Sequence, residues 1–311
     1  MSLSQILRGL RLRLIAYFLR SSHAITAFFR RIIGTPPHFT RFAPNRSFSI
    51  ASNISSRRVK INVFEPEGFD RGKKYPVYMN FHGSGFVIPG LGKDADFCRF
   101  VSNQTGAVVL DCDYAKAPEW PFPAAPDDVK DIIAHVIQNR EGYFDTARLA
   151  IGGFSAGGNL ALTSGMNQAP GTLKAAIAFY PPTDLTQGAK RPQPEGDSSS
   201  LSAWRTQFFD DSYIPPDMDK SDPRLSPNFA PITSFPEHVF IAVCGNDCLQ
   251  YEALALADRL EKGGIKLVRR FIPGVGHGWD KEAQGGTLGG QAKHDAYVAA
   301  VEVLKTAFKS H

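Results

Sequence analysis

The first 64 residues of this chain lack aspartate and glutamate altogether, whereas the full 311 residues contain 30 acidic side chains. The same segment holds eleven lysine and arginine residues, so the formal net charge of +5 arises here and the rest of the chain is net acidic. Basic charge alone is weak support for nucleic-acid binding, and no recognised nucleic-acid motif accompanies it. We therefore expect no nucleic-acid partner.

Cysteine is also scarce, with four residues in the whole chain. Four cysteines do not form the dense disulfide framework of a small secreted domain, and no secretory signal peptide is evident. Cys244 and Cys248 could form half of a zinc site, but no second Cys/His pair at ligand spacing completes it. Reduced thiols in an intracellular, cytoplasmic location are the simpler expectation.

Long apolar runs are absent as well, and without 18 consecutive apolar residues no helix is expected to span a membrane. The N-terminal segment is amphipathic instead, since its apolar side chains share one helical stripe and Arg8, Arg13 and Arg20 lie off it. The stripe consists of Leu3, Ile6, Leu7, Leu10, Leu14, Tyr17 and Phe18. Such a helix could close over a binding site as a cap, contact a membrane surface through residues 1–33, or act as an Arg-rich mitochondrial presequence.

The remainder of the chain alternates between short apolar runs and longer helical patterns. This alternation predicts an α/β fold with a mostly parallel sheet that helices cover on both faces. Strands are expected at 57–64, 75–81, 107–111, 149–152, 174–180, 238–244 and 265–272, and helices at 124–139, 156–166, 251–262 and 290–308. Between 180 and 238 the alternation gives way to a stretch rich in proline, glycine and serine, with one short helix expected at 201–211.

The sequence Gly-Phe-Ser-Ala-Gly-Gly at 153–158 follows the apolar run 149–151 and precedes a helical pattern. This is the G-x-S-x-G nucleophile elbow in its required context, a sharp turn between a strand and a helix that exposes a serine hydroxyl. Glycines flank the serine because larger side chains would meet neighbouring backbone. Ser155 is therefore the candidate nucleophile, with a plain glycine-rich turn as the alternative.

A second loop of small residues, His-Gly-Ser-Gly-Phe at 82–86, follows the strand-like run 75–81. Consecutive backbone N–H groups in such a loop can point into one cavity, as an oxyanion hole requires. We predict that Gly83 and Ser84 supply two donors and that Ala156, just after the nucleophile, supplies a third.

A carboxylate and a histidine follow the last two predicted strands. Asp247 comes shortly after 238–244, and His277 lies in the glycine-rich stretch 273–279. The chain order Ser, Asp, His is that of the α/β-hydrolase triad, in which the carboxylate holds the imidazole that activates the serine. Lesser alternatives for the acid are Asp222, Glu252 and Asp280.

Five ordered motifs resemble those of the hormone-sensitive-lipase-like branch of the α/β-hydrolases. They read HGSGF (82–86), DYAKAPE (113–119), GFSAGG (153–158), DCL (247–249) and HGW (277–279). The resemblance covers roughly residues 60–308. It implies an α/β-hydrolase fold with a helical cap and a serine esterase that needs no metal ion and no organic cofactor. It also favours the cap for the N-terminal helix, because relatives place such helices over the acyl pocket.

Ser84 and Phe154 are among the residues that depart from the pattern of that family. Ser84 stands where the family has the middle glycine of its oxyanion loop, which keeps the N–H but adds a side chain beside the reacting carbonyl. Phe154 stands where the family has an aspartate that helps to brace neighbouring loops. We expect altered pocket shape and packing rather than loss of the chemistry.

The sequence thus predicts a basic N-terminal segment over 1–56 that forms part of the cap, and a catalytic domain over 57–311 with a cap insertion around 183–235. The expected function is hydrolysis of small-molecule, short- to medium-chain carboxylic esters through an acyl-enzyme. Two alternatives stay open, an esterase of specialised metabolism that deacetylates an aromatic or polyketide-type ester, and a non-catalytic small-ligand receptor on the same fold. No oligomeric state follows from the sequence.

Overall fold

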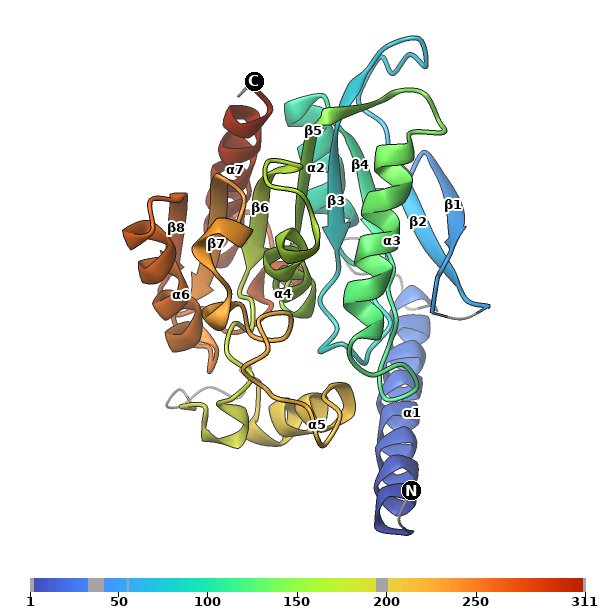
Figure 1. Ribbon diagram of the computed structural model, residues 1–311, viewed down its shortest axis with the longest axis vertical. Coiled ribbons are helices and arrows are strands. Elements are labelled where there is room, and N and C mark those ends of the chain that lie inside the picture. Colours follow the sequence, from blue (N-terminus) through green and yellow to red (C-terminus); the bar gives the residue numbers. More distant parts are fainter. Residues whose placement is uncertain (1–2, 33–41, 55, 194–200, 310–311) are drawn as a thin grey trace.

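An eight-stranded sheet forms the centre of the molecule in the computed structural model, which describes residues 3–32, 42–54, 56–193 and 201–309 (Figure 1). The strand order is β1-β2-β4-β3-β5-β6-β7-β8. β2 pairs antiparallel with β1 and with β4, and every other neighbouring pair in the sheet is parallel. The predicted α/β fold with a mostly parallel sheet is confirmed.

Most predicted elements occur within a few residues of their expected bounds. The strands are β1 (Arg46–Ala51), β2 (Arg58–Phe64), β3 (Tyr75–Phe81), β4 (Val108–Cys112), β5 (Phe144–Phe154), β6 (Leu173–Phe179), β7 (His238–Cys244) and β8 (Lys266–Ile272). The α-helices are α1 (Leu3–Ile32), α2 (Ala95–Thr105), α3 (Ala124–Gln138), α4 (Ala156–Thr163), α5 (Ala203–Tyr213), α6 (Gln250–Lys262) and α7 (Leu288–Lys309). β1 and α2 were not predicted.

β1 lies in the segment that was expected to be separate from the catalytic domain. It pairs with β2 along its whole length, from Arg46 opposite Val63 to Ala51 opposite Arg58. Because the sheet therefore begins at Arg46, the boundary predicted between 56 and 57 is wrong. The six residues of β1 include only two large apolar side chains, which is too weak an alternation to be recognised from the pattern alone.

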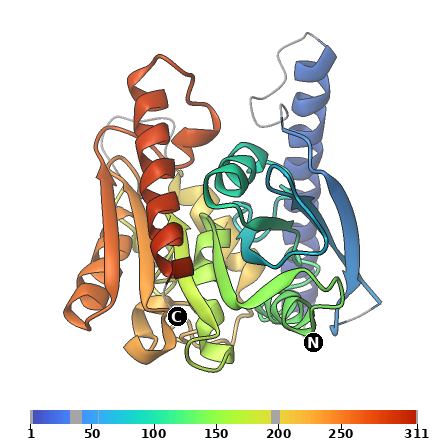
Figure 2. The ribbon, with the colours of Figure 1, turned by 90° about the horizontal axis from the view of Figure 1, so that it is seen from above.

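Helices cover both faces of the sheet, so the core has two layers (Figures 1 and 2). α2 and α7 pack on one face, and α3, α4 and α6 pack on the other. β7 is buried at all seven of its residues, as expected for a strand that is covered on both sides. α7 buries the apolar stripe Ala296, Ala300, Val303, Leu304 and Ala307.

The described residues of the 183–235 segment lie across one end of the sheet and include α5 (Figure 1). The Arg191 side chain is only 2% exposed and ties this segment to α6, since it pairs with Asp210 of α5 at 3.0 Å and with Glu252 of α6 at 2.9 Å. Burial raises the pKa of Glu252 to about 7, and the neighbouring Arg191 opposes that rise. Removing one partner of a buried ion pair costs roughly 3–5 kcal/mol, because the other charge is left buried without a partner, so substitution of Arg191 should destabilise this contact.

α1 contacts the domain through one side. Leu12, Ile15, Ala16 and Leu19 pack on the core that contains α5 and the loop after β3. Two arginines hold the helix in place. Arg8 pairs with Asp211 of α5 at 3.0 Å. The Arg20 guanidinium pairs with Glu119 at 2.8 Å and donates to the carbonyl oxygens of Val87 and Ala117.

The apolar stripe identified in the sequence lies on the other side of α1 and faces solvent. Leu14, Tyr17 and Phe18 are 70%, 73% and 71% exposed. The helix therefore has two apolar sides, and the one that packs on the domain was not singled out by the sequence pattern. Within the described ranges, neither α1 nor any other helix has the length and hydropathy needed to cross a bilayer.

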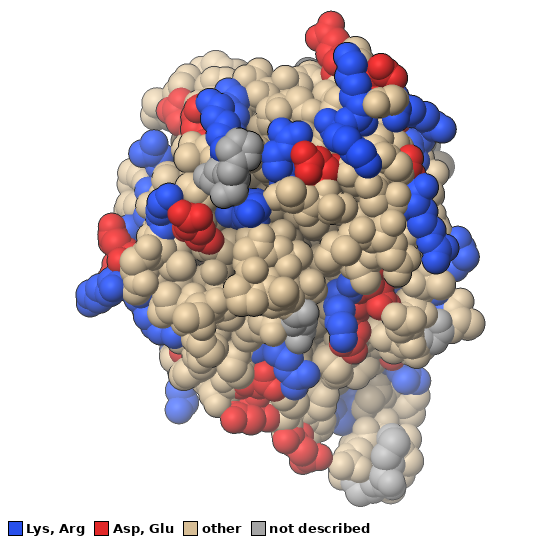
Figure 3. All heavy atoms as spheres, turned by 45° about the horizontal axis from the view of Figure 1, so that its top comes forward, with Lys and Arg blue, Asp and Glu red and all other residues tan. Residues whose placement is uncertain are grey.

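On the face shown in Figure 3, basic and acidic side chains are interspersed. Proteins that bind nucleic acid usually collect basic residues on one face or along one helix. The face in Figure 3 therefore adds no support for a nucleic-acid partner.

Candidate active site

Ser155 occupies a strained turn between β5 and α4. Its backbone φ is +52°, a value that a residue with a side chain adopts only where the surrounding structure enforces it. The glycines of the motif make this turn possible, because a Cβ at Gly153 or at Gly157 would overlap the carbonyl oxygen of Phe81 at the end of β3. Adjacent strands therefore bring the elbow and the 82–86 loop together.

The structure brings the three predicted triad residues into one chain of hydrogen bonds. His277 Nε2 lies 2.8 Å from Ser155 Oγ, and His277 Nδ1 lies 2.6 Å from Asp247 Oδ2. Asp247 is 1% exposed and lies at the carboxyl end of β7, where it also accepts the N–H of Leu249 at 3.1 Å. With a proton on Nδ1, the imidazole faces the serine with an unprotonated nitrogen, as a general base requires.

The three alternative acids lie elsewhere and have other partners. Glu252 pairs with Arg191, and Asp222 pairs with Arg224. Asp280 accepts a hydrogen bond from Tyr180 at 2.6 Å and pairs with Lys281. Asp247 is thus the carboxylate whose position supports the role of the acid.

The predicted oxyanion donors line the same cavity as the triad. Gly83, Ser84 and Ala156 border it together with Ser155 and His277. Among the described residues, none accepts a hydrogen bond from the backbone N–H groups of Gly83, Ser84 or Ala156. Buried N–H groups are usually paired, and unpaired donors at a cavity wall suit an anion that forms only during a reaction.

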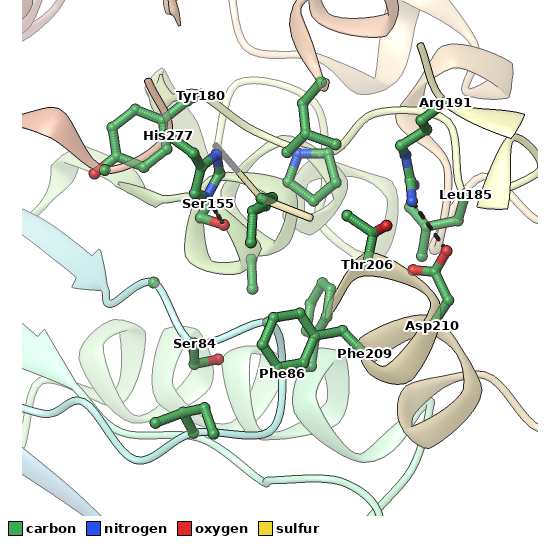
Figure 4. A pocket seen from close by; sticks show the side chains of 18 of the residues that line it. Ser84, Phe86, Ser155, Tyr180, Leu185, Arg191, Thr206, Phe209, Asp210 and His277 are labelled. Atoms are coloured by element: carbon green, nitrogen blue, oxygen red, sulfur yellow. Dashed lines mark hydrogen bonds and ion pairs between the residues drawn. The ribbon is translucent and has the colours of Figure 1, made fainter. Parts of the chain in front are cut away.

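The cavity has a volume of about 310 Å³ and lies between the ends of the strands and the 183–235 segment. Its wall is mainly apolar, and Figure 4 shows Phe86 and Phe209 side by side opposite the Ser155–His277 pair. Leu185 and Arg191 form one end of the pocket together with Thr206 and Asp210 of α5. The cap segment predicted at 183–235 therefore supplies part of the pocket wall.

Residues 78–281 match a family model described as alpha/beta hydrolase fold. The chain belongs to this family. It is 30% identical over 224 residues to an ethyl acetate hydrolase of Pseudomonas putida, and the match covers 70% of this chain and 70% of that protein. It is 29% identical over 245 residues to an AB hydrolase superfamily protein of Schizosaccharomyces pombe, with 75% of this chain and 70% of that protein covered.

A solved structure of an ester hydrolase from the metagenome of Lake Arreo, in complex with a bipyridine phosphonate derivative, superposes with a TM-score of 0.73. The identity is 26%, and the match covers 97% of this chain and 98% of that chain. The predicted family, the hormone-sensitive-lipase-like α/β-hydrolases, is confirmed together with the enzyme class. The protein is a carboxylic ester hydrolase, and neither the deacetylase nor the receptor alternative is favoured.

Ser84, the departure from the family's oxyanion loop, is held by a tyrosine of the DYAKAPE motif. Its Oγ lies 2.6 Å from Tyr114 Oη, and the Tyr114 hydroxyl donates to the carbonyl oxygen of His82 at 2.7 Å. Because that hydroxyl has only one proton, Ser84 is the donor in the first of these bonds. The Ser84 side chain therefore supports the loop through Tyr114. The motif alone did not indicate this role of Tyr114.

Phe154, the departure beside the nucleophile, is fully buried. Its ring stacks on Phe179, with the centroids 4.5 Å apart, and the Lys281 ammonium lies 3.3 Å from its centroid. Lys281 also pairs with Asp94 at 2.7 Å and with Asp280 at 2.8 Å. The expected change in packing thus takes the form of a stacked aromatic ring that contacts the Lys281 ammonium.

Cys244 and Cys248 flank the acid without forming a metal site. Both are free and buried, and burial raises the pKa of the Cys248 thiol to about 12. No group of three or more His, Cys, Asp or Glu side chains that could hold a metal ion occurs within the described part of the chain. The two thiols therefore pack as small apolar groups.

Proposed function

We propose that the protein hydrolyses short- to medium-chain carboxylic esters through an acyl-enzyme on Ser155. The observation that carries this proposal is the position of the His277 imidazole, whose two nitrogens lie within 2.8 Å of the serine hydroxyl and 2.6 Å of the buried Asp247 carboxylate. The family and its esterase members support the reaction class.

The steps follow from these contacts. His277 takes the Ser155 proton as the hydroxyl attacks the ester carbonyl, and Asp247 stabilises the resulting imidazolium. The N–H groups of Gly83, Ser84 and Ala156 stabilise the negative oxygen of the tetrahedral intermediate. His277 then protonates the leaving alcohol and activates the water molecule that releases the acid. No step needs a metal ion or a cofactor.

The size and lining of the cavity support the substrate range. A volume of about 310 Å³ is near the lower limit for small-molecule sites. Each methylene that the wall buries contributes about 0.8 kcal/mol, or roughly fourfold in kcat/KM, until the acyl chain reaches the end of the pocket. Longer chains must then distort the wall or protrude.

With nitrophenyl esters of increasing acyl length, we expect kcat/KM to peak at about two to eight carbons and to fall steeply beyond that range. EDTA should leave the rates unchanged. A maximum at about sixteen carbons, with activation at an oil–water interface, would contradict the proposed substrate class and indicate a lipase. Preference for one acetylated aromatic alcohol would support the more specialised esterase instead.

We also propose that residues 1–33 contact an anionic membrane surface while the inner side of α1 forms part of the cap. The exposed stripe of α1 is apolar along the helix, and Arg11 and Arg13 are exposed on its two opposite edges, one turn from Leu7 and Tyr17. Helices of this kind lie in the lipid interface with their cations near the headgroups. Residues 1–64 also contain no acidic side chain that an anionic surface would repel.

This proposal predicts that the intact protein co-sediments with phosphatidylserine-containing vesicles and is released by salt, since each basic residue near an anionic surface contributes about 1 kcal/mol. Tyr17→Glu should lower binding at least tenfold, because it places a charge in the apolar stripe. Tyr251→Glu is the matched control, since Tyr251 is 57% exposed on α6, and it should bind like the wild type. Turnover of a soluble ester should stay unchanged in both variants.

Two outcomes of the vesicle experiment would count against membrane contact. The first is an absence of vesicle binding by the wild type. The second is an equal loss of binding in both variants. Loss of soluble-ester turnover on deletion of 1–20, without vesicle binding by the intact protein, would leave the cap as the sole role of the helix. A cytoplasmic location at such a surface is consistent with the four free thiols, whereas cleavage of the N-terminus in mitochondria would indicate a presequence.

A further inference from the structure

A cluster of charged side chains borders the catalytic pocket and includes Asp280, three residues after His277 in the sequence. Asp280 is fully buried. Its Oδ2 lies 2.8 Å from Lys281 Nζ, which also pairs with Asp94 and covers the ring of Phe154. The cluster is therefore in contact with the residue that precedes the nucleophile.

Tyr180 connects this cluster to the imidazole of His277. Its hydroxyl donates to Asp280 Oδ1 at 2.6 Å. Its ring meets the His277 ring edge to face, with the centroids 4.8 Å apart and the planes at 65°. Figure 4 shows the Tyr180 ring beside His277, with the hydroxyl directed away from the pocket.

The backbone of Tyr180 is held as firmly as its side chain. It follows β6 with φ at +40°, in a region that a bulky residue seldom adopts. Its N–H donates to the carbonyl oxygen of Ala242 in β7 at 2.7 Å. Strained residues of this kind persist where the surrounding structure fixes them, and they gather at functional sites. Burial raises the pKa of the Tyr180 phenol well above its ordinary value, so the hydroxyl stays protonated and available as a donor.

We infer that Tyr180 is a positioning residue for His277 and that the buried Asp280 carboxylate holds it in place. The hydrogen bond to Asp280 fixes the ring, and the ring limits the rotation of the imidazole between Ser155 and Asp247. A fixed general base matters because a small misplacement of a catalytic group lowers the rate steeply. This inference rests on the proposed role of His277 as the base.

Two phenylalanine substitutions separate positioning from structural support. Tyr297 also donates to Asp280, to Oδ2 at 2.9 Å, and is buried like Tyr180. Among the described residues, its ring contacts are with other aromatic side chains and with Lys293, not with His277. Tyr180→Phe and Tyr297→Phe therefore each remove one hydroxyl that donates to Asp280. Only Tyr180→Phe loosens a ring that contacts His277.

We expect Tyr180→Phe to lower kcat about tenfold with KM unchanged. Inactivation by a fluorophosphonate, which also needs the base, should slow by the same factor. Tyr297→Phe should change both rates less than twofold, while both variants lower the Tm by similar amounts. Equal kcat values in the two variants, or an effect of Tyr180→Phe on KM alone, would overturn the inference. An active His277→Ala variant would contradict the proposed function itself, whereas the two outcomes for the tyrosine variants would contradict only the positioning role of Tyr180.

Discussion

Replacement of Ser155 by alanine is expected to lower kcat by about 10⁴- to 10⁶-fold, because the members of a triad act as a unit and the remaining groups cannot form the acyl-enzyme. The fold should be unchanged, since the side chain that is lost is small and the strained turn is set by the glycines around it. The measurement is kcat on a short-chain nitrophenyl ester, with circular dichroism as a check of the fold.

Ser164→Ala is the matched control for this substitution. Ser164 is a second buried serine nearby in the chain, and its hydroxyl donates to the carbonyl oxygen of Ala161 at 2.7 Å, away from the triad. It should retain nearly full activity. Comparable activity in Ser155→Ala and Ser164→Ala would rule out the proposed nucleophile.

Substitution of the acid and the base should have effects nearly as large. His277→Ala removes the group that takes the serine proton, and its loss of kcat should approach that of Ser155→Ala. Asp247→Asn should lower kcat by about 10⁴-fold, because the amide presents its N–H to the imidazole and favours the wrong tautomer. Both are measured with the same ester at saturating concentration.

Glu252→Gln is the control that shows whether the loss of any buried carboxylate lowers activity, or only the loss of Asp247. Glu252 is buried like Asp247 but faces Arg191, so its substitution should lower stability and leave most of the turnover. Near-normal activity in Asp247→Asn, together with loss in Glu252→Gln, would show that the acid is wrongly assigned.

The parts of the molecule that follow from local pattern could be predicted from the sequence. β7 and β3 consist mostly of apolar residues because both strands are buried on both faces. The elbow could be located because its glycines are needed at fixed offsets from Ser155. Asp247 and His277 each follow a strand, and parallel strands that end at one edge of a sheet bring such residues together.

Other features depend on long-range packing and could not be predicted from the local sequence pattern. β1 is recognisable only through its pairing with β2, and its six residues carry little apolar character. The inner side of α1 is defined by its contact with α5, whereas the sequence shows more clearly the stripe that faces solvent. The link from Tyr180 through Asp280 to Lys281 joins residues about 100 positions apart, and its one local signal is a tyrosine at the end of a strand.

The central claim is a covalent ester on Ser155, formed with the help of His277. Mass spectrometry after treatment with a fluorophosphonate tests it most directly. The account predicts one adduct per chain, located on Ser155, absent from Ser155→Ala and formed far more slowly in His277→Ala. An adduct on a different serine, or unlabelled Ser155 in an enzyme whose esterase activity has been abolished by the reagent, would contradict it.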